Sequence, residues 1–146
     1  MNDLKNLYQE VILDHSKHPR HFHALDPCDH SATGYNPLCG DNLKIFVRMD
    51  GDTIADVSFV GDGCAISKAS ASLMTDLARG KTLDQFAALY HDFHHIATTQ
   101  DPIPDSVGKL KVLAGVREYP SRVKCATLAW HTLDAALHGK TEAKTE

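Results

Sequence analysis

The first residues of the chain repeat apolar side chains at roughly every third or fourth position, which is the period of one face of an α-helix. This pattern predicts an amphipathic helix over residues 3–16, with its apolar face formed by Leu4, Leu7, Tyr8, Val11, Ile12 and His15. Pro19 prevents the helix from continuing, because proline lacks an amide hydrogen and clashes with the preceding turn. Residues 18–37 are rich in His, Pro, Asp and Gly, and indicate a connecting stretch with one irregular strand near residues 30–36.

The middle of the chain changes to the period of a β-strand. Apolar and polar residues alternate over 43–49 and again over 53–60, so each segment has one apolar face. Asp50 and Gly51 stand between the segments and favour the left-handed backbone of a tight hairpin turn. The two segments are therefore predicted to pair as antiparallel strands.

Helical periods return after Gly63 and continue to the end of the chain. We expect a helix that begins near Cys64, another that begins at Thr82, a loop over 97–106, a short helix from Val107, and a last helix over 126–137. The polar residues 139–146 are predicted to form a flexible tail. Because strands precede helices along the chain, we predict a single α+β domain over 1–146, in which a small antiparallel sheet of about three strands packs against several α-helices.

The composition agrees with one ordinary globular domain. The chain has 146 residues, of which 42% are hydrophobic and 23% are charged. Its net charge of −4 argues against binding to nucleic acid or to an anionic membrane, since both require a basic surface. No apolar run approaches the roughly 18 residues of a membrane span, and the first residues lack the apolar core of a secretory signal. We therefore expect a soluble cytoplasmic protein.

Four cysteines, at positions 28, 39, 64 and 125, carry the strongest candidate chemistry. Their wide spacing includes no C-x-x-C pair, so it matches neither a zinc finger nor a thioredoxin motif. In the cytoplasm, cysteines serve more often as metal ligands or reactive thiols than as disulfides. Three of the four lie at junctions of predicted elements, whereas Cys28 lies in the irregular connector and is interpreted as a free thiol.

The three junction cysteines have neighbours that favour an ionised thiol. Cys64 stands at a helix start, where free N–H groups and the helix dipole stabilise a thiolate. Cys125 is predicted in the first turn of the last helix, where Arg122 and Lys124 supply positive charge with the same effect. A thiolate is the form that binds metal or attacks sulfur.

Cys39 has a carboxylate as its neighbour. In an extended segment, residues two apart point to the same side, so Cys39 and Asp41 can face one ion. Three thiolates with one carboxylate suit zinc or the iron of an iron–sulfur cluster, and the harder carboxylate holds these ions less tightly. Closed structural zinc sites use Cys and His, so a mixed set favours a carrier or transfer role.

The histidines show no comparable pattern. Those at positions 15, 18, 21, 23 and 30 lack a fixed spacing, and we interpret them as solvated surface rather than as a metal-binding tract. His94 and His95 fall within a predicted helix and are expected at an interface or at the edge of the core.

Four blocks of the sequence resemble the IscU/SufU/NifU-type iron–sulfur cluster assembly proteins, in the order of that family and over residues 4–138. They read LYQEVILDH at 7–15, NPLCGD at 36–41, GDGCAISKASAS at 61–72 and RVKCATL at 122–128. The chain looks most like the SufU branch. Its interval between Cys64 and Cys125 is longer than in IscU by about one short helix, Lys124 stands where IscU-type scaffolds have histidine, and the LPPVK chaperone-binding motif is absent.

The resemblance implies a SufE/IscU-like fold with Cys39, Asp41, Cys64 and Cys125 as metal ligands, and zinc in the resting protein. Arg122 and Lys124 are auxiliary candidates at the same site. It implies further that Cys39 accepts persulfide sulfur from a pyridoxal-phosphate cysteine desulfurase of the SufS kind, within a SUF cluster-assembly complex. The same ligands could hold iron in a nascent [2Fe–2S] cluster that is passed to apo-protein acceptors.

Two further hypotheses belong to other classes. A small interaction module that zinc merely stabilises would use the same residues and would unfold when the metal is removed. A thiol-dependent hydrolase based on Cys64 lacks a fixed Cys–His pair and an oxyanion hole in the sequence, so it has little support.

Overall fold

In the computed structural model of the chain, residues 2–144 are described, and the side chains of residues 2–8 are not. The first helix, α1, spans Asn2–Lys17, which agrees with the predicted helix over 3–16. Its expected apolar positions Leu4, Leu7 and Tyr8 lie outside the described side chains, whereas Val11 and Ile12 pack against the core. None of the helices described is both long and apolar enough to cross a membrane.

The strands form one sheet of mixed direction. Strands β1 (His30–Asn36), β2 (Asp41–Asp50) and β3 (Thr53–Asp62) are antiparallel neighbours, and β4 (Glu142–Lys144) pairs in parallel with β1. The order across the sheet is β3-β2-β1-β4. The predicted hairpin and the irregular strand near 30–36 are thus both present.

The fourth strand differs from the flexible tail expected over residues 139–146, because residues 142–144 of that segment pair with the sheet, and residues 145–146 lie outside those described. The amide of Thr33 donates to the carbonyl of Thr141 at 2.9 Å, and three β4 residues pair with β1 beyond it. Strand pairing uses backbone groups, which a polar side chain leaves available. The polar residues of β4 therefore pair with the edge of β1, although their composition predicts a tail.

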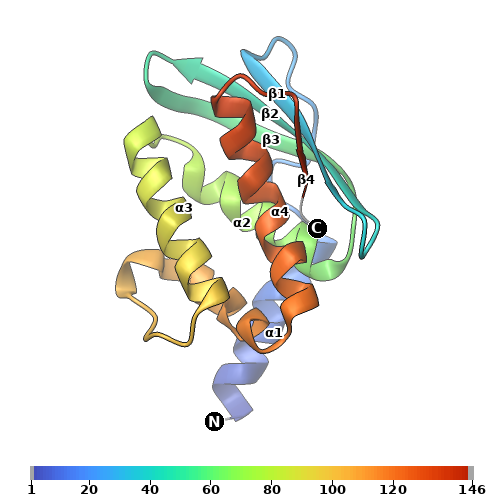
Figure 1. Cartoon of the computed structure of the whole chain (residues 1–146), viewed down its shortest axis with the longest axis vertical. Helices are drawn as coiled ribbons and strands as arrows, with labels where there is room; N and C mark the ends of the chain where they lie inside the picture. Colours follow the sequence, from blue (N-terminus) through green and yellow to red (C-terminus); the bar gives the residue numbers. More distant parts are fainter. Residues whose placement is uncertain (1, 145–146) are drawn as a thin grey trace.

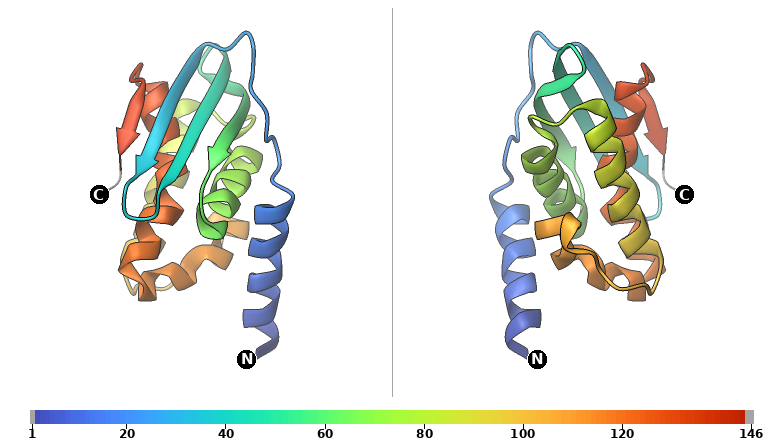
Figure 2. Two further views of the ribbon diagram at one scale, coloured as in Figure 1. Left: turned by 90° about the vertical axis from the view of Figure 1, so that its right-hand side faces the viewer. Right: turned by 90° about the vertical axis from the view of Figure 1, so that its left-hand side faces the viewer.

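The helices cover one face of this sheet, as Figures 1 and 2 show. They are α2 (Ala65–Ala78), α3 (Leu83–Thr98), the 3-10 segment η1 (Asp105–Glu118) and α4 (Pro120–Leu137). The core lies between the two layers and includes Trp130, Phe59, Phe86 and Phe93, all almost fully buried. The architecture is α+β, as the order of elements predicts.

Helix α4 packs directly on the sheet at a glycine. A Cβ atom added to Gly34 of β1 would lie 1.9 Å from Oγ1 of Thr132, so only glycine permits this approach. The helix begins at Pro120, which places Cys125 in the second turn and not in the first. Proline suits the first position of a helix, where no partner for its missing N–H is needed.

His15 corrects the interpretation of the histidine-rich stretch as solvated surface. Its side chain is buried between α1 and α2, and its Nδ1 lies 2.7 Å from the hydroxyl oxygen of Ser72. Burial lowers the pKa of His15, because an imidazolium loses hydration there. His18 and His23 are exposed, in agreement with the interpretation.

Candidate metal centre

The turn between β1 and β2 carries Cys39 at its tip. Asn36 and Asp41 face each other as the last pair of the ladder, and the amide of Gly40 donates to the carbonyl of Asn36 at 2.9 Å. Gly40 has φ of 72°, a left-handed conformation that glycine adopts without strain. The turn therefore closes tightly and leaves the Cys39 side chain exposed.

Asp41 is buried at the first position of β2, with its carboxylate held on both oxygens. Its Oδ1 accepts the amide N–H of Cys64 at 2.9 Å, and its Oδ2 accepts the side-chain amide of Asn36 at 3.1 Å. A Cβ atom on Gly63 would lie only 2.9 Å from Oδ1. The glycine before Cys64 thus allows the start of α2 to approach this carboxylate.

Cys64 is the N-cap residue of α2. Its Sγ accepts the amide N–H of Ser67 at 3.4 Å, a contact that satisfies one of the free donors at the helix start. The pKa of Arg122 is raised, chiefly by its hydrogen bond with Cys125 and further by the charge of Cys64. The Cys64 side chain also helps to raise the pKa of Cys125, so Cys64 lies beside the other cysteines while it caps its own helix.

Cys125 is fully buried in α4, and its Sγ lies 3.1 Å from Sγ of Cys39. Burial raises the pKa of Cys125, and hydrogen bonds with Cys39 add to the effect. This differs from the sequence argument that neighbouring cations lower its pKa. The Arg122 side chain is exposed, so its charge is screened by water, and desolvation of the thiolate outweighs it.

Three of the four expected ligands meet at one point. The ligand atoms of Cys39, Asp41 and Cys125 all lie within 4.8 Å of one another, close enough to share a metal ion. Cys64 lies outside this 4.8 Å group, but its side chain is close enough to Cys125 to help raise the pKa of that thiol, and its amide holds the Asp41 carboxylate. Cys28 is exposed and carries a free thiol, in agreement with the sequence analysis.

Asn36 is a site residue that the sequence analysis did not single out. It is fully buried, and its side-chain amide also donates to Sγ of Cys125 at 3.5 Å. Ala32, Gly34 and Asn36 alternate on the inward face of β1, all buried. Its signal in the sequence is a polar residue at the last inward-facing position of the strand. A buried polar side chain needs hydrogen-bond partners, so such a residue indicates a polar site at that end of the strand.

The comparisons with known proteins decide the family. Residues 7–144 match the NifU-like N terminal domain. The chain belongs to this family. It therefore groups with proteins of iron–sulfur cluster assembly, which confirms the resemblance found in the sequence.

Two relatives from bacteria show how the family divides. The chain is 39% identical over 145 residues to the iron–sulfur cluster assembly scaffold protein IscU of Streptococcus pyogenes serotype M1, covering 99% of this chain and 91% of that protein. It is 38% identical over 135 residues to the zinc-dependent sulfurtransferase SufU of Bacillus subtilis, covering 90% of each. The two identities are nearly equal, so the branch is not resolved.

Solved structures agree with the fold. A protein described as a putative iron–sulfur cluster assembly scaffold for the SUF system, from Fervidobacterium islandicum AW-1, has a TM-score of 0.81 and 35% identity, with 88% of this chain and 94% of that chain covered. A crystal structure of a hypothetical protein has a TM-score of 0.85 and 40% identity, with 92% and 98% covered. The IscU-like fold of this chain is thereby confirmed.

Proposed function

We propose that this protein accepts persulfide sulfur from a cysteine desulfurase at Cys39, within a zinc site formed by Cys39, Asp41, Cys64 and Cys125. The observation that supports this is the contact between an exposed and a buried cysteine, with sulfur atoms 3.1 Å apart beside a buried carboxylate. Such a site has one ligand that a partner can reach and others that stay fixed. We place it in the cytoplasm, where thiols remain reduced.

The donor set fits zinc. Cys39, Asp41 and Cys125 offer sulfur and carboxylate ligands within reach of one ion, and rotation of the Cys64 side chain away from Ser67 would add a fourth. Zinc takes four such ligands in tetrahedral geometry and keeps thiols ionised. Bound zinc would thus supply the thiolate at Cys125 that burial alone opposes. Arg122 can offset part of the negative charge.

Sulfur transfer needs Cys39 as a free thiolate. Its Sγ attacks the outer sulfur of the desulfurase persulfide, forms a new S–S bond, and breaks the old S–S bond. The desulfurase cysteine leaves as a thiolate, so the negative charge passes from Cys39 to that cysteine. No oxidant or reductant is consumed. Cys39 can leave the other ligands because it lies in an exposed turn.

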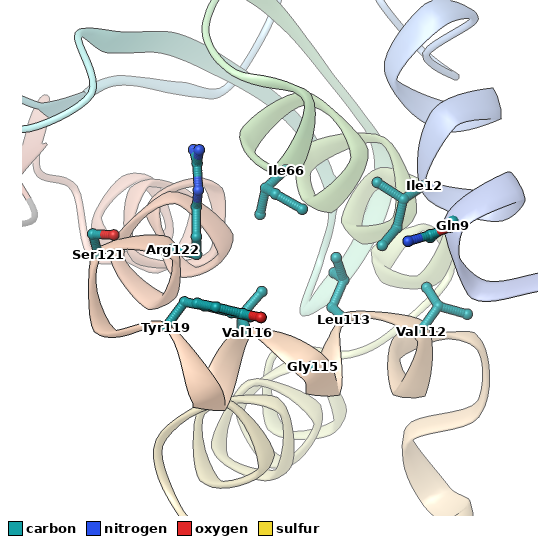
Figure 3. Close-up of a pocket in the computed structure, with 10 residues that line it drawn as sticks. All are labelled: Gln9, Ile12, Ile66, Val112, Leu113, Gly115, Val116, Tyr119, Ser121 and Arg122. Atoms are coloured by element: carbon teal, nitrogen blue, oxygen red, sulfur yellow. The ribbon is translucent and has the colours of Figure 1, made fainter. Parts of the chain in front are cut away.

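The surface around Cys39 fits a protein partner. Leu38 and Tyr119, which are 63% and 64% exposed, are among the large apolar side chains left in solvent. Tyr119 and Arg122 also line one end of an apolar groove of about 550 Å³, which Figure 3 shows extending to Ile12 of α1. We propose that the desulfurase docks over this end of the molecule, because its persulfide must reach Cys39.

A second candidate function is that of a scaffold on which a [2Fe–2S] cluster is built and passed to apo-proteins. The relative from Streptococcus pyogenes carries the name of scaffold protein, and the identity to it is as high as to the sulfurtransferase. The same thiolates and carboxylate suit iron in a cluster. A purely structural zinc module is a third and weaker candidate.

The test uses the purified protein with a cysteine desulfurase, cysteine and a thiol reductant. We expect the wild-type chain to stimulate alanine release, and Cys39→Ala to abolish the stimulation. Cys28→Ala is the matched control, since Cys28 is also exposed, and it should stimulate as the wild type does. Equal stimulation by Cys39→Ala would overturn the sulfur-acceptor proposal.

Two measurements separate the alternatives. After anaerobic purification, one equivalent of zinc without acid-labile sulfide supports transfer, and iron with matching sulfide supports the scaffold. Chelation followed by thermal melting tests the structural module, which must lose its cooperative transition when the metal is removed.

A further inference from the structure

A group of histidines lies between α3 and α4, outside the cysteine cluster. The imidazole rings of His94 on α3 and His131 on α4 have centroids 5.9 Å apart, at an interplanar angle of 68°. His91 precedes His94 by about one helical turn and so shares its face of α3. The three histidines line one hollow of about 320 Å³ together with Ala87 and Tyr90.

Tyr90 fixes the orientation of His131. Its phenol oxygen is hydrogen-bonded to Nδ1 of His131, and the two rings meet edge to face. In the tautomer in which Nδ1–H donates to the phenol oxygen, Nε2 carries a free lone pair. Metal-binding histidines are usually held in this way, with the second ring nitrogen bonded to a neighbouring group.

We propose that His94 and His131, with His91 as a third donor, form a second metal site that takes a divalent transition-metal ion such as Ni²⁺, Co²⁺ or Zn²⁺. Imidazole nitrogen is a preferred ligand of these ions. Two imidazoles that share one ion at bond lengths of about 2.0–2.1 Å hold their centroids roughly 4.5–5.2 Å apart, so the pair observed at 5.9 Å would close by roughly 1 Å on binding. The site is independent of the sulfur chemistry proposed above.

His91 joins this pair by a change of rotamer. Among the described residues, Cys39, Asp41 and Cys125 are the only three candidate ligands whose donor atoms already lie within 4.8 Å of one another. His91 is exposed on α3 and stacks on His95 with ring centroids 6.5 Å apart, so turning its ring toward the hollow breaks only that exposed contact. The remaining coordination positions would be filled by water, since the hollow is open to solvent.

Helix α4 connects the two sites. Cys125 and His131 are six residues apart on this helix, which corresponds to about 9 Å along its axis. His94 and His131 also line a neighbouring hollow together with Lys124 and Lys144. Those amines would favour an anion, so phosphate is the competing ligand that the experiment must exclude.

The experiment starts from the full chain with its cysteine site filled by one equivalent of zinc. Isothermal titration with Ni²⁺ should show one further equivalent bound, and His94→Ala or His131→Ala should weaken that binding by at least about tenfold. His23→Ala is the matched control, because His23 is exposed in the connector before β1 and its ring bonds to the carbonyl oxygen of Ala24. Its affinity for Ni²⁺ should equal that of the wild type.

Two further controls test the proposal. Tyr90→Phe retains the aromatic ring and should weaken Ni²⁺ binding by about tenfold, through the lost hydrogen bond alone. With Co²⁺ as the probe, the added equivalent should give a spectrum without thiolate-to-metal charge transfer, which separates it from the cysteine site. Absence of a second equivalent, equal loss in His94→Ala and His23→Ala, or binding of inorganic phosphate without Ni²⁺ would each overturn the proposal.

Discussion

The turn that carries Cys39 and the helix that carries Cys125 bring their sulfur atoms to 3.1 Å, yet they differ in every other respect. The turn is four residues of exposed chain between two strands. Helix α4 is packed against the sheet at Gly34, and Cys125 has no exposed surface. Cys39 is therefore able to move, and Cys125 is held by the core.

In the function proposed above, this difference would allow one site both to keep a metal and to exchange sulfur. A buried ligand with partners on all sides is costly to displace, since its motion requires local opening of the structure. A ligand in a short exposed turn moves at the cost of a few backbone contacts. We therefore expect Cys125 to stay fixed and Cys39 to exchange.

The largest expected effect is on alkylation in the metal-free protein. Cys39 should react with iodoacetamide about three to four orders of magnitude faster than Cys125, because Cys125 reacts only after an opening that costs several kcal/mol. Burial also raises the pKa of Cys125 and keeps it as the unreactive thiol. Peptide mass spectrometry measures both rates, with exposed Cys28 as the internal reference. Similar rates for Cys39 and Cys125 would contradict the comparison.

A smaller difference is expected in zinc affinity. Cys39→Ser should weaken zinc binding by about 10–100-fold, because water can replace an exposed fourth ligand while three protein ligands remain. Cys125→Ser should weaken it by at least about tenfold more, since its buried position admits no such replacement. Competition with a chromophoric chelator gives both constants. If Cys39→Ser proves the weaker binder, Cys39 is the anchored ligand instead.

The packing of α4 can be disturbed without touching a ligand. Gly34→Ala places a methyl group against Oγ1 of Thr132 and should lower the free energy of unfolding by about 1–3 kcal/mol. Gly115→Ala is the control, because no atom lies within 4 Å of its added Cβ, and it should change stability by less than about 0.5 kcal/mol. Urea denaturation measures both. Adding Thr132→Ala to Gly34→Ala should recover part of the lost free energy of unfolding, because it removes the clashing hydroxyl. Equal effects of Gly34→Ala and Gly115→Ala would show that α4 is packed loosely on the sheet.

The smallest effect concerns the pH dependence of stability. The Ser72 hydroxyl oxygen accepts the amide N–H of Arg20 at 2.8 Å, so its hydrogen is directed to Nδ1 of His15. Burial lowers the pKa of His15 in the folded protein below its ordinary value of 6.5. Below pH 6.5, His15 is therefore protonated more readily in the unfolded chain than in the folded one. The contribution of His15 to the free energy of unfolding is therefore fully present above pH 6.5 and is lost as the pH falls below it. The loss is at most about 1.4 kcal/mol per pH unit for one proton.

His15→Gln should remove that part of the slope in denaturation measured at about pH 5.5 and 7.5. Cys125 contributes nothing in this range, because its raised pKa leaves the metal-free thiol protonated throughout. An unchanged slope in His15→Gln would show that another group governs the acid sensitivity of the fold.

Local patterns predicted most of the secondary structure, because periodicity is a property of neighbouring residues. The hairpin of β2 and β3 follows from alternation over 43–49 and 53–60, and α3 begins as predicted after Thr82, whose capping box with Gln85 is complete. The segment η1 departs from the expected short helix, since Gly108 has φ of 53° and breaks its regularity. Strand β4 was missed, because its partner β1 lies more than a hundred residues away.

The sequence by itself determined the family and the residues that could serve as ligands, because these depend on residue types and their order along the chain. Tertiary structure alone decided that Cys39 is exposed, that Cys125 is buried, and that Asn36 and Cys64 hold the Asp41 carboxylate between them. It also brought together His94 and His131, which the sequence leaves unconnected. Exposure and contact depend on which distant element covers a residue, and no local pattern contains that information.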